Sequence, residues 1–300
     1  MDISQEKFLS LSTEEIAHLV HKSGPKVCVF PINGTRRWFV LEHGNDIQDD
    51  PIKAYVDIAT QNHIELYKLF FSHGINTLVT PEFGPDLLLR GDEYVQQIGA
   101  EGLAKLANDS TLLNFYNEYD VRVHFYGDHR RFLHGTKLEY LSDLFDLVAE
   151  RTRTHGRYRL FFGIFGNDAT QAIVEFSANY YQQKGRLPEK RELIEMYYGE
   201  YVEPVSLFIG FDRFSVFDMP LIATGEEDLY FTFSPSLYMN AIQLRCILYD
   251  HLYTRRVPDI EYSDMPLEEL QELHNIYIQR REYTLGTGEL LHGIWIPSIK

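Results

Sequence analysis

Short apolar runs and longer helix-type repeats alternate along the chain. The apolar runs, each followed by glycine, proline or serine, are strand candidates over residues 26–30, 76–80, 121–126, 157–165, 207–209 and 229–233. Between them, apolar residues recur every three or four positions, which predicts helices over about 4–22, 52–73, 86–119, 138–148, 172–180, 188–197, 238–253 and from about 266. Strands that alternate with helices predict an α/β fold with a central parallel sheet of about six strands, flanked by helices.

Polar, glycine-containing segments follow several of the predicted strands. These are Asn33–Phe39, Gly127-Asp128, Gly166-Asn167-Asp168 and Gly210–Arg213. Parallel sheets bind ligands beyond the carboxyl ends of their strands. We therefore expect these segments to converge on one edge of the sheet. For Asn167 and Asp168, an Asx turn without a role in binding is an alternative.

The segment Asn33–Phe39 has the composition of an anion-binding loop. Gly34 lets the backbone approach a ligand closely. Arg36 and Arg37 carry guanidinium groups that match phosphate oxygens two at a time. A strand end with two solvated arginines lying over Trp38 is the alternative interpretation.

Length and composition indicate an ordinary globular protein. The chain has 300 residues, 44% of them hydrophobic and 24% charged. It shows no internal repeat or linker, so we expect one domain over residues 1–300, with about 256–300 as a C-terminal helical extension. The net charge of −16 argues against binding to nucleic acid or to anionic membranes.

The sequence also predicts a location. Cys28 and Cys246 are the only cysteines, which favours a reducing compartment. The first residues lack the basic and apolar regions of a signal peptide, and no apolar run is long enough for a transmembrane segment. We therefore expect a cytoplasmic protein.

Several motifs, taken in order, resemble the cis-prenyltransferases, the (Z)-prenyl synthases. Asn33–Trp38 is similar to that family's phosphate loop, and Arg213-Phe214-Ser215-Val216-Phe217 matches its Arg-X-Ser-X-Phe diphosphate motif. Asp120–Asp128 and Asp228-Leu229-Tyr230-Phe231 are similar to two further segments of the family. A run of motifs in family order is far more specific than any one of them.

Other segments resemble the branch of this fold that consumes cyclic diterpene diphosphates, which includes kolavelool and tuberculosinol or tuberculosinyl-adenosine enzymes. They extend the likeness from about residue 5 to residue 255. The segments are 24–27, 34–39, 90–92, 125–128, 165–169, 197–202 and 248–251.

The resemblance implies roles for individual residues. Gly34, Thr35, Arg36, Arg37, Arg213 and Ser215 would hold the diphosphate, and Tyr55, Asn33 and Arg37 would be catalytic. Cations stabilise the negative charge that builds as a diphosphate departs. A tyrosine can orient water, donate to a phosphate oxygen or offer its π face to a cation. The alternatives are a half-buried helix aromatic for Tyr55, and for Arg213 a surface ion pair with Asp212 or Asp218.

The chain departs from the elongating members of the family. Their phosphate-loop aspartate, a magnesium ligand, is Asn33 here, and an uncharged amide oxygen binds Mg²⁺ weakly. Their loop for the second diphosphate is shortened to Gly210-Phe211-Asp212, which argues against chain elongation. Their late glutamate is Asp228, which keeps a carboxylate. A Mg²⁺ ion held by Asp228 and the substrate phosphates is therefore the predicted cofactor site.

These observations predict a homodimeric diterpene synthase or diphosphate hydrolase. It would ionise a bicyclic allylic C20 diphosphate, such as kolavenyl or tuberculosinyl diphosphate, and add water to the cation, giving a tertiary diterpene alcohol. Two alternatives stay open. One is transfer of the same cation to a nucleoside such as adenosine, and the other is a non-catalytic partner subunit of an active homologue.

Overall fold

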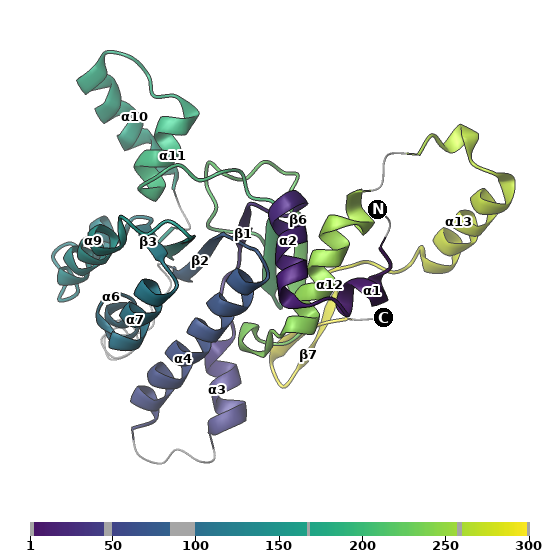
Figure 1. The fold of residues 1–300 in the computed structure, drawn as a ribbon, viewed down its shortest axis with the longest axis horizontal. Coiled ribbons are helices and arrows are strands. Elements are labelled where there is room, and N and C mark those ends of the chain that lie inside the picture. Colours follow the sequence, from purple (N-terminus) through teal and green to yellow (C-terminus); the bar gives the residue numbers. More distant parts are fainter. Residues whose placement is uncertain (1–2, 45–49, 85–99, 167–168, 257–259, 299–300) are drawn as a thin grey trace.

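The computed structural model describes residues 3–44, 50–84, 100–166, 169–256 and 260–298. A six-stranded, wholly parallel sheet lies at its centre, in the order β3-β4-β2-β1-β5-β6 (Figure 1). The strands are β1 (Val27–Val29), β2 (Thr77–Phe83), β3 (Val121–Tyr126), β4 (Tyr158–Ile164), β5 (Leu207–Phe211) and β6 (Asp228–Thr232). The predicted fold class and all six predicted strands are confirmed.

Helices cover both faces of this sheet because successive side chains of a strand point to opposite faces. Cys28 of β1 lies in the larger core, beneath α2 (Thr13–Ser23), α4 (Pro51–Ser72), α6 (Glu101–Asn108), α7 (Ser110–Glu118), α9 (Tyr140–Thr152) and α12 (Ala241–Leu252). Its neighbours Val27 and Val29 lie in a smaller core on the other face, with residues of α11 (Lys190–Tyr198). A central strand that is buried on both sides reads as an unbroken apolar run, which is why the pattern of the sequence predicted it.

Most predicted helices are confirmed, with bounds that differ by a few residues. The helices that pack around the sheet are α1 (Gln5–Leu9), α2 (Thr13–Ser23), α4 (Pro51–Ser72), α6 (Glu101–Asn108), α7 (Ser110–Glu118), α8 (His129–Leu133), α9 (Tyr140–Thr152), α11 (Lys190–Tyr198), η3 (Ser236–Tyr238) and α12 (Ala241–Leu252). Residues 85–99, part of the long helix predicted over 86–119, lie outside the described residues. None of the described helices is long and apolar enough to cross a membrane.

Two elements differ from the prediction. Helix α3 (Thr35–His43) begins inside the expected anion-binding loop. Its apolar residues Trp38 to Leu41 are consecutive, so they show no helical period. A hairpin of β7 (Gly288–Leu291) and β8 (Ile294–Pro297) ends the chain, where the sequence predicted a purely helical extension.

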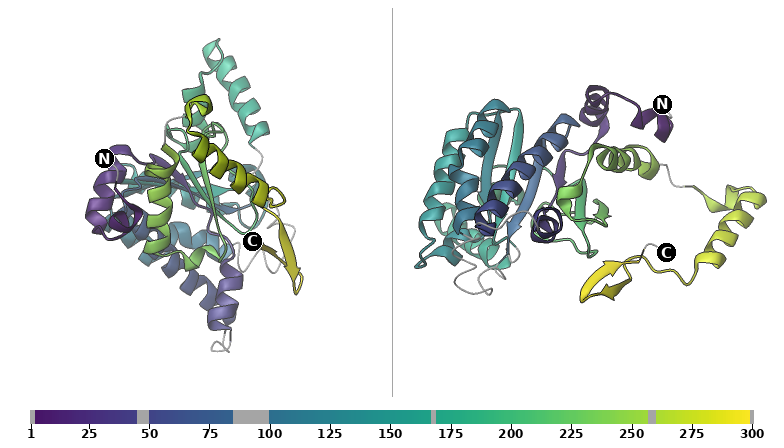
Figure 2. Two further views of the ribbon diagram at one scale, coloured as in Figure 1. Left: turned by 90° about the vertical axis from the view of Figure 1, so that its right-hand side faces the viewer. Right: turned by 90° about the horizontal axis from the view of Figure 1, so that it is seen from below.

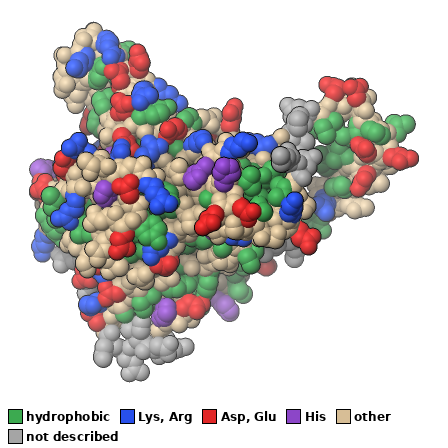
Figure 3. Space-filling model, viewed as in Figure 1, with side chains coloured by type: hydrophobic (Ala, Val, Ile, Leu, Met, Phe, Trp, Pro, Cys, Tyr) green, Lys and Arg blue, Asp and Glu red, His purple; other side chains and the backbone are tan. Residues whose placement is uncertain are grey.

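Two regions project from the sheet and its helices. Helix α10 (Thr170–Lys184) forms a hairpin with α11, and α13 (Leu267–Arg280) stands apart beyond α12 (Figures 1 and 2). The short helices η4 (Thr254–Arg256) and η5 (Tyr262–Asp264) precede α13, and the β7–β8 hairpin follows it. Acidic and hydrophobic side chains lie next to one another on the α13 projection (Figure 3). Leu267 and Leu285 there are exposed.

Candidate active site

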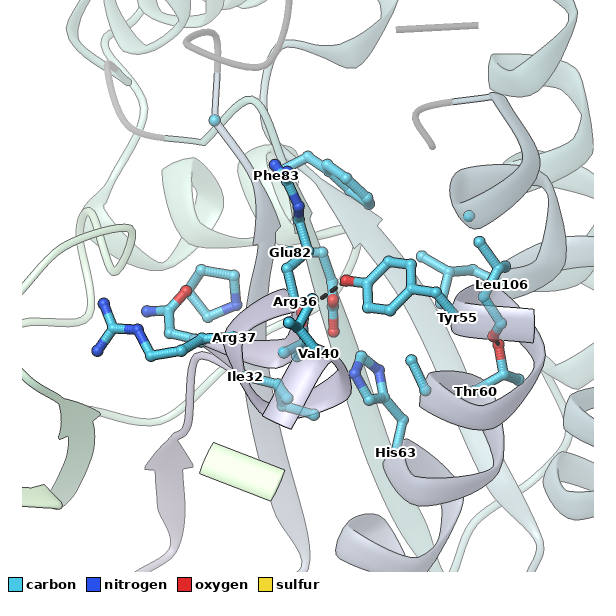
Figure 4. A pocket seen from close by; sticks show the side chains of 18 of the residues that line it. Ile32, Arg36, Arg37, Val40, Tyr55, Thr60, His63, Glu82, Phe83 and Leu106 are labelled. Carbon is cyan, nitrogen blue, oxygen red and sulfur yellow. Dashed lines mark hydrogen bonds between the residues drawn. The ribbon is translucent and has the colours of Figure 1, made fainter. Parts of the chain in front are cut away.

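A cavity of about 1000 Å³ opens at the carboxyl edge of the sheet (Figure 4). Residues of α3, α4 and α6 line it, together with the loop after β1, the end of β2 and Ile294 of β8. Its volume lies at the upper end of the range for small-molecule sites, roughly 300–1,000 Å³. Asn33, Gly34, Thr35, Arg36, Arg37 and Tyr55, all predicted site residues, line this one cavity.

The predicted phosphate loop is a sharp turn into a helix N-terminus. Gly34 has φ +75°, and a Cβ atom built on it would lie 2.7 Å from Cε1 of Phe211, so both the conformation and the space require glycine. Helix α3 begins at the next residue, Thr35. The N–H groups of its first turn have no partner within the helix, and together with the helix dipole they suit a bound anion.

Ser236 of η3 fixes the loop from behind. Its hydroxyl accepts a hydrogen bond from the Asn33 amide at 3.0 Å and donates one to the Pro31 carbonyl at 3.2 Å. Its own amide donates to the Asn33 carbonyl at 3.0 Å. The backbone of Asn33 is therefore held on both sides, and its side chain lines the cavity. Sequence analysis missed Ser236, because no local pattern links it to a loop 200 residues earlier.

Two arginines follow on the first turn of α3. The Arg37 guanidinium lies 3.6 Å from an Asp212 carboxylate oxygen and 5.4 Å from the centre of the Phe211 ring. Asp212 thus orients Arg37. One alternative for Arg213 was an ion pair with Asp212, but Asp212 pairs with Arg37 instead. Arg36 is exposed at the cavity mouth. Both arginines line the cavity beside the first amides of α3, and their side chains point to different sides of it (Figure 4).

Tyr55 contacts the same turn. Its hydroxyl lies 2.7 Å from the Thr35 hydroxyl, a hydrogen bond in which either group can be the donor. Its ring packs edge-on against Phe39, with centroids 5.3 Å apart. The phenol is therefore held at the boundary between the anion-binding turn and the apolar wall formed by residues such as Val56, Ala59 and Leu106.

Glu82 and His63 are polar residues of the cavity that sequence analysis missed. Glu82 stands near the carboxyl end of β2, just beyond the strand predicted over residues 76–80, and His63 lies on α4. Burial raises the pKa of the Glu82 carboxyl to about 8, against the opposing effect of the Thr80 and Tyr67 hydroxyls. Burial lowers the pKa of His63 to about 4. At neutral pH both side chains are therefore mainly uncharged.

Arg213 and Ser215 lie outside the lining of this cavity. They are exposed in the loop after β5, where the Ser215 amide donates to the Arg213 carbonyl at 2.8 Å. Phe217 and Asp218, farther along the same loop, do line the cavity. The structure thus brings this loop to the expected edge of the sheet without placing its predicted diphosphate ligands at the cavity.

Asp228 stands at the other edge of the sheet. It is the first residue of β6, and the phosphate loop follows the last residue of the parallel strand β1. His251 Nδ1 lies 2.6 Å from its carboxylate and Arg256 Nη2 lies 2.9 Å from it. Arg255 contributes a third contact at 3.5 Å. Asp228 and the phosphate loop therefore lie at opposite ends of their parallel strands, and a Mg²⁺ ion held by Asp228 and the substrate phosphates stays a prediction.

The known proteins that the chain resembles agree with this architecture. No protein-family model matches it. A probable undecaprenyl diphosphate synthase from Campylobacter jejuni matches in fold with a TM-score of 0.57 at 16% identity, over 77% of this chain and 97% of that one. A lavandulyl diphosphate synthase from Lavandula x intermedia, solved with dimethylallyl diphosphate, gives a TM-score of 0.55 at 13% identity, over 80% and 98%.

In sequence, a tuberculosinyl adenosine transferase from Mycobacterium tuberculosis is 43% identical over 298 residues, 99% of each chain. The chain belongs to the cis-prenyltransferase family. A (+)-kolavelool synthase from Herpetosiphon aurantiacus is 24% identical over 285 residues, 93% of this chain and 91% of that one. Both relatives fall in the branch that the motifs indicated.

For this cis-prenyltransferase, the cavity does not fit a metal held by the protein alone. Among the described residues, no group of three or more His, Cys, Asp or Glu side chains could hold a metal ion. Asn33 offers an uncharged oxygen, and the arginines and His251 already surround Asp228. Mg²⁺ commonly binds through one or two carboxylates plus substrate phosphates. Binding of Mg²⁺ to this chain therefore remains a prediction, in which the ion would arrive together with the diphosphate.

Proposed function

We propose that this enzyme transfers the diterpenyl group of a bicyclic allylic C20 diphosphate to adenosine. The observation that carries the proposal is the 43% identity to a tuberculosinyl adenosine transferase along essentially the whole of both chains. This likeness favours the nucleoside alternative over the addition of water, which the sequence motifs had suggested first.

The anion-binding turn would bind and stabilise the leaving group. As the allylic C–O bond breaks, its electron pair goes to the diphosphate oxygen. Arg36, Arg37 and the first amides of α3, all at the cavity, would stabilise the negative charge that develops there. The Thr35–Tyr55 pair supplies a hydroxyl donor at the same turn. Preorganised donors of this kind need little rearrangement during the reaction, so they stabilise the departing charge more than they stabilise the substrate.

The rest of the cavity suits the hydrocarbon and its cation. Apolar side chains of α4 and α6 line its wall, and the Tyr55 and Phe83 rings border it. Aromatic faces attract a carbocation through the quadrupole of the ring. A nitrogen of adenosine would then donate its lone pair to the allylic carbon, which forms the C–N bond and moves the positive charge from the hydrocarbon to the nucleoside.

Addition of water is the second candidate. The (+)-kolavelool synthase is the relative that supports it, at lower identity. The same turn and cavity would serve both reactions, and only the nucleophile would differ. The homodimer and the cytoplasmic location remain predictions.

Incubation of the purified chain with a panel of bicyclic C20 diphosphates, with and without adenosine, tests the proposal. We expect a diterpenyl-adenosine adduct by mass spectrometry, with one pyrophosphate released per adduct. If only the alcohol forms, and its yield does not change when adenosine is added, the addition of water is favoured. Release of no pyrophosphate from any member of the panel would exclude both and leave the partner-subunit alternative.

A further inference from the structure

The cavity has a polar wall that neither the diphosphate nor the hydrocarbon can use. Tyr55, Ala59, His63 and Tyr67 follow one another at four-residue spacing on α4, so they lie along one side of the helix. Glu82 of β2 faces this row, and Tyr55, His63 and Glu82 point into the same cavity (Figure 4).

Among the described residues, hydrogen bonding leaves this wall only partly satisfied. The Tyr67 hydroxyl donates to Oε1 of Glu82 at 3.3 Å, and a carboxyl oxygen with two lone pairs can accept a second hydrogen bond. Nε2 of His63 is buried and has no hydrogen-bond partner in the described part of the chain. Polar groups removed from water without partners are costly, and such groups in a native cavity usually have a ligand to meet.

The charges around the polar wall indicate which class of ligand suits it. A carboxyl group repels a diphosphate when ionised, and the arginines at the start of α3 already serve that anion. A hydrocarbon offers no hydrogen bond. A neutral, hydrogen-bonding molecule remains, and a nucleobase has both the N–H donors and the flat shape to enter between the apolar wall and β2.

We infer that Glu82 and His63 form the binding site for the nucleobase, in which Glu82 accepts a hydrogen bond from the exocyclic amino group of adenine. The inference rests on the proposed transfer to adenosine and adds the residue that selects this nucleoside. Tyr67 is a positioning residue, because its hydroxyl holds the Glu82 carboxyl without reaching the cavity lining.

Purine riboside tests the inference, because it is adenosine without the exocyclic amino group. Binding of each nucleoside is measured by titration calorimetry on the full chain saturated with inorganic pyrophosphate. We expect adenosine to bind about ten-fold more tightly than purine riboside, the factor that corresponds to one hydrogen bond of about 1.4 kcal/mol. Glu82→Leu should bring the two dissociation constants together, and Glu82→Gln, which keeps an acceptor oxygen, should retain much of the preference.

Controls separate recognition from folding. Glu65→Leu changes an exposed glutamate of α4 outside the cavity and should leave the preference for adenosine unchanged. If the role of Glu82 is purely structural, Glu82→Leu should weaken the binding of both nucleosides equally. If Glu82→Leu does not fold, Glu82→Ala takes its place, and an undiminished preference for adenosine in that variant overturns the inference.

The outcomes also distinguish the two proposals. If the wild-type chain forms the adenosine adduct but the preference for adenosine persists in Glu82→Leu, the inference alone is wrong. If the wild-type chain forms no adduct with any nucleoside, the proposed function fails, and the inference fails with it.

Discussion

The two edges of the central sheet each carry a carboxyl side chain in a protein interior, and the two are used in opposite ways. Asp228 at the amino edge is surrounded by His251, Arg255 and Arg256. Glu82 at the carboxyl edge faces a cavity and accepts a hydrogen bond from the Tyr67 hydroxyl. Asp228 is held in ion pairs with its neighbours, whereas Glu82 lines a space that a ligand can enter.

The comparison teaches that position in the sheet decides the role of a buried charge. Every strand of the sheet runs in the same direction, so all loops that can build one binding site leave the same edge. A carboxylate that precedes its strand is on the wrong side for the phosphate loop, however well its local sequence resembles a ligand motif.

The largest expected effect comes from Arg37→Ala at the carboxyl edge. Loss of a preorganised cation at the developing charge should lower kcat for pyrophosphate release by about 10²–10³-fold. Arg256→Ala, at the amino edge, is the matched control and should leave kcat unchanged. Equal losses in the two variants would remove the distinction between the edges.

Tyr55→Phe should have the next largest effect. The variant keeps the ring against Phe39 but removes the hydrogen bond to Thr35. We expect kcat to fall about ten-fold, because a hydrogen bond of about 1.4 kcal/mol corresponds to that factor. Tyr230→Phe removes a hydroxyl bonded to Asp250 near the amino edge and serves as the control. A Tyr55→Phe variant with the rate of the wild type would restrict Tyr55 to packing.

The substitution Asn33→Asp tests whether an added carboxylate at the carboxyl edge creates a Mg²⁺ site there. The substitution adds a charged oxygen at the start of α3, where the substrate phosphates are expected. The half-saturating Mg²⁺ concentration for turnover should fall several-fold, with Asn33→Ser as the uncharged control. Unchanged turnover together with unchanged Mg²⁺ dependence would show that position 33 does not govern metal binding.

The pH dependence of stability should differ between wild type and Glu82→Gln. Folding raises the pKa of Glu82 from 4.5 to about 8, so the native state holds the proton more tightly than the unfolded state does. The Glu82 contribution to the free energy of unfolding is therefore full below about pH 4.5 and is lost as the pH rises to about 8. As the pH rises across this range, the melting temperature of the wild type should fall to that of Glu82→Gln or below it. A constant difference would contradict the raised pKa.

Asp228→Asn should have the smallest effect on turnover. Removing the charge leaves His251, Arg255 and Arg256 without their shared partner, which should cost on the order of 3 kcal/mol of stability and several degrees in Tm. The half-saturating Mg²⁺ concentration should stay unchanged. If the half-saturating Mg²⁺ concentration shifts under conditions where the variant is fully folded, Asp228 takes part in metal binding after all.

Sequence patterns predicted the sheet well and the site in part. Buried parallel strands such as β1 are unbroken apolar runs with clear ends, so their order alone gave the binding edge. The same rule could have found Glu82, which follows the second apolar run, and could have excluded Asp228, which precedes the last one. Motif likeness was given more weight than strand direction at both positions.

Other parts of the site had no local signal. Ser236 holds the phosphate loop across about 200 residues of chain, through one backbone hydrogen bond that any residue could make and two hydrogen bonds of its hydroxyl. Helix α3 was missed because its apolar residues are consecutive and its start is set by Gly34. Contacts that depend on tertiary structure leave no period in the sequence.

The central claim is that the carboxyl edge holds the diphosphate. A crystal structure of the chain with an unreactive diterpenyl thiolodiphosphate and adenosine tests it most directly. We predict that the diphosphate contacts Arg36, Arg37 and the first amides of α3, with the adenine amino group next to Glu82. A diphosphate bound at the Asp228 edge, or held by Arg213 and Ser215 away from the start of α3, would contradict the account.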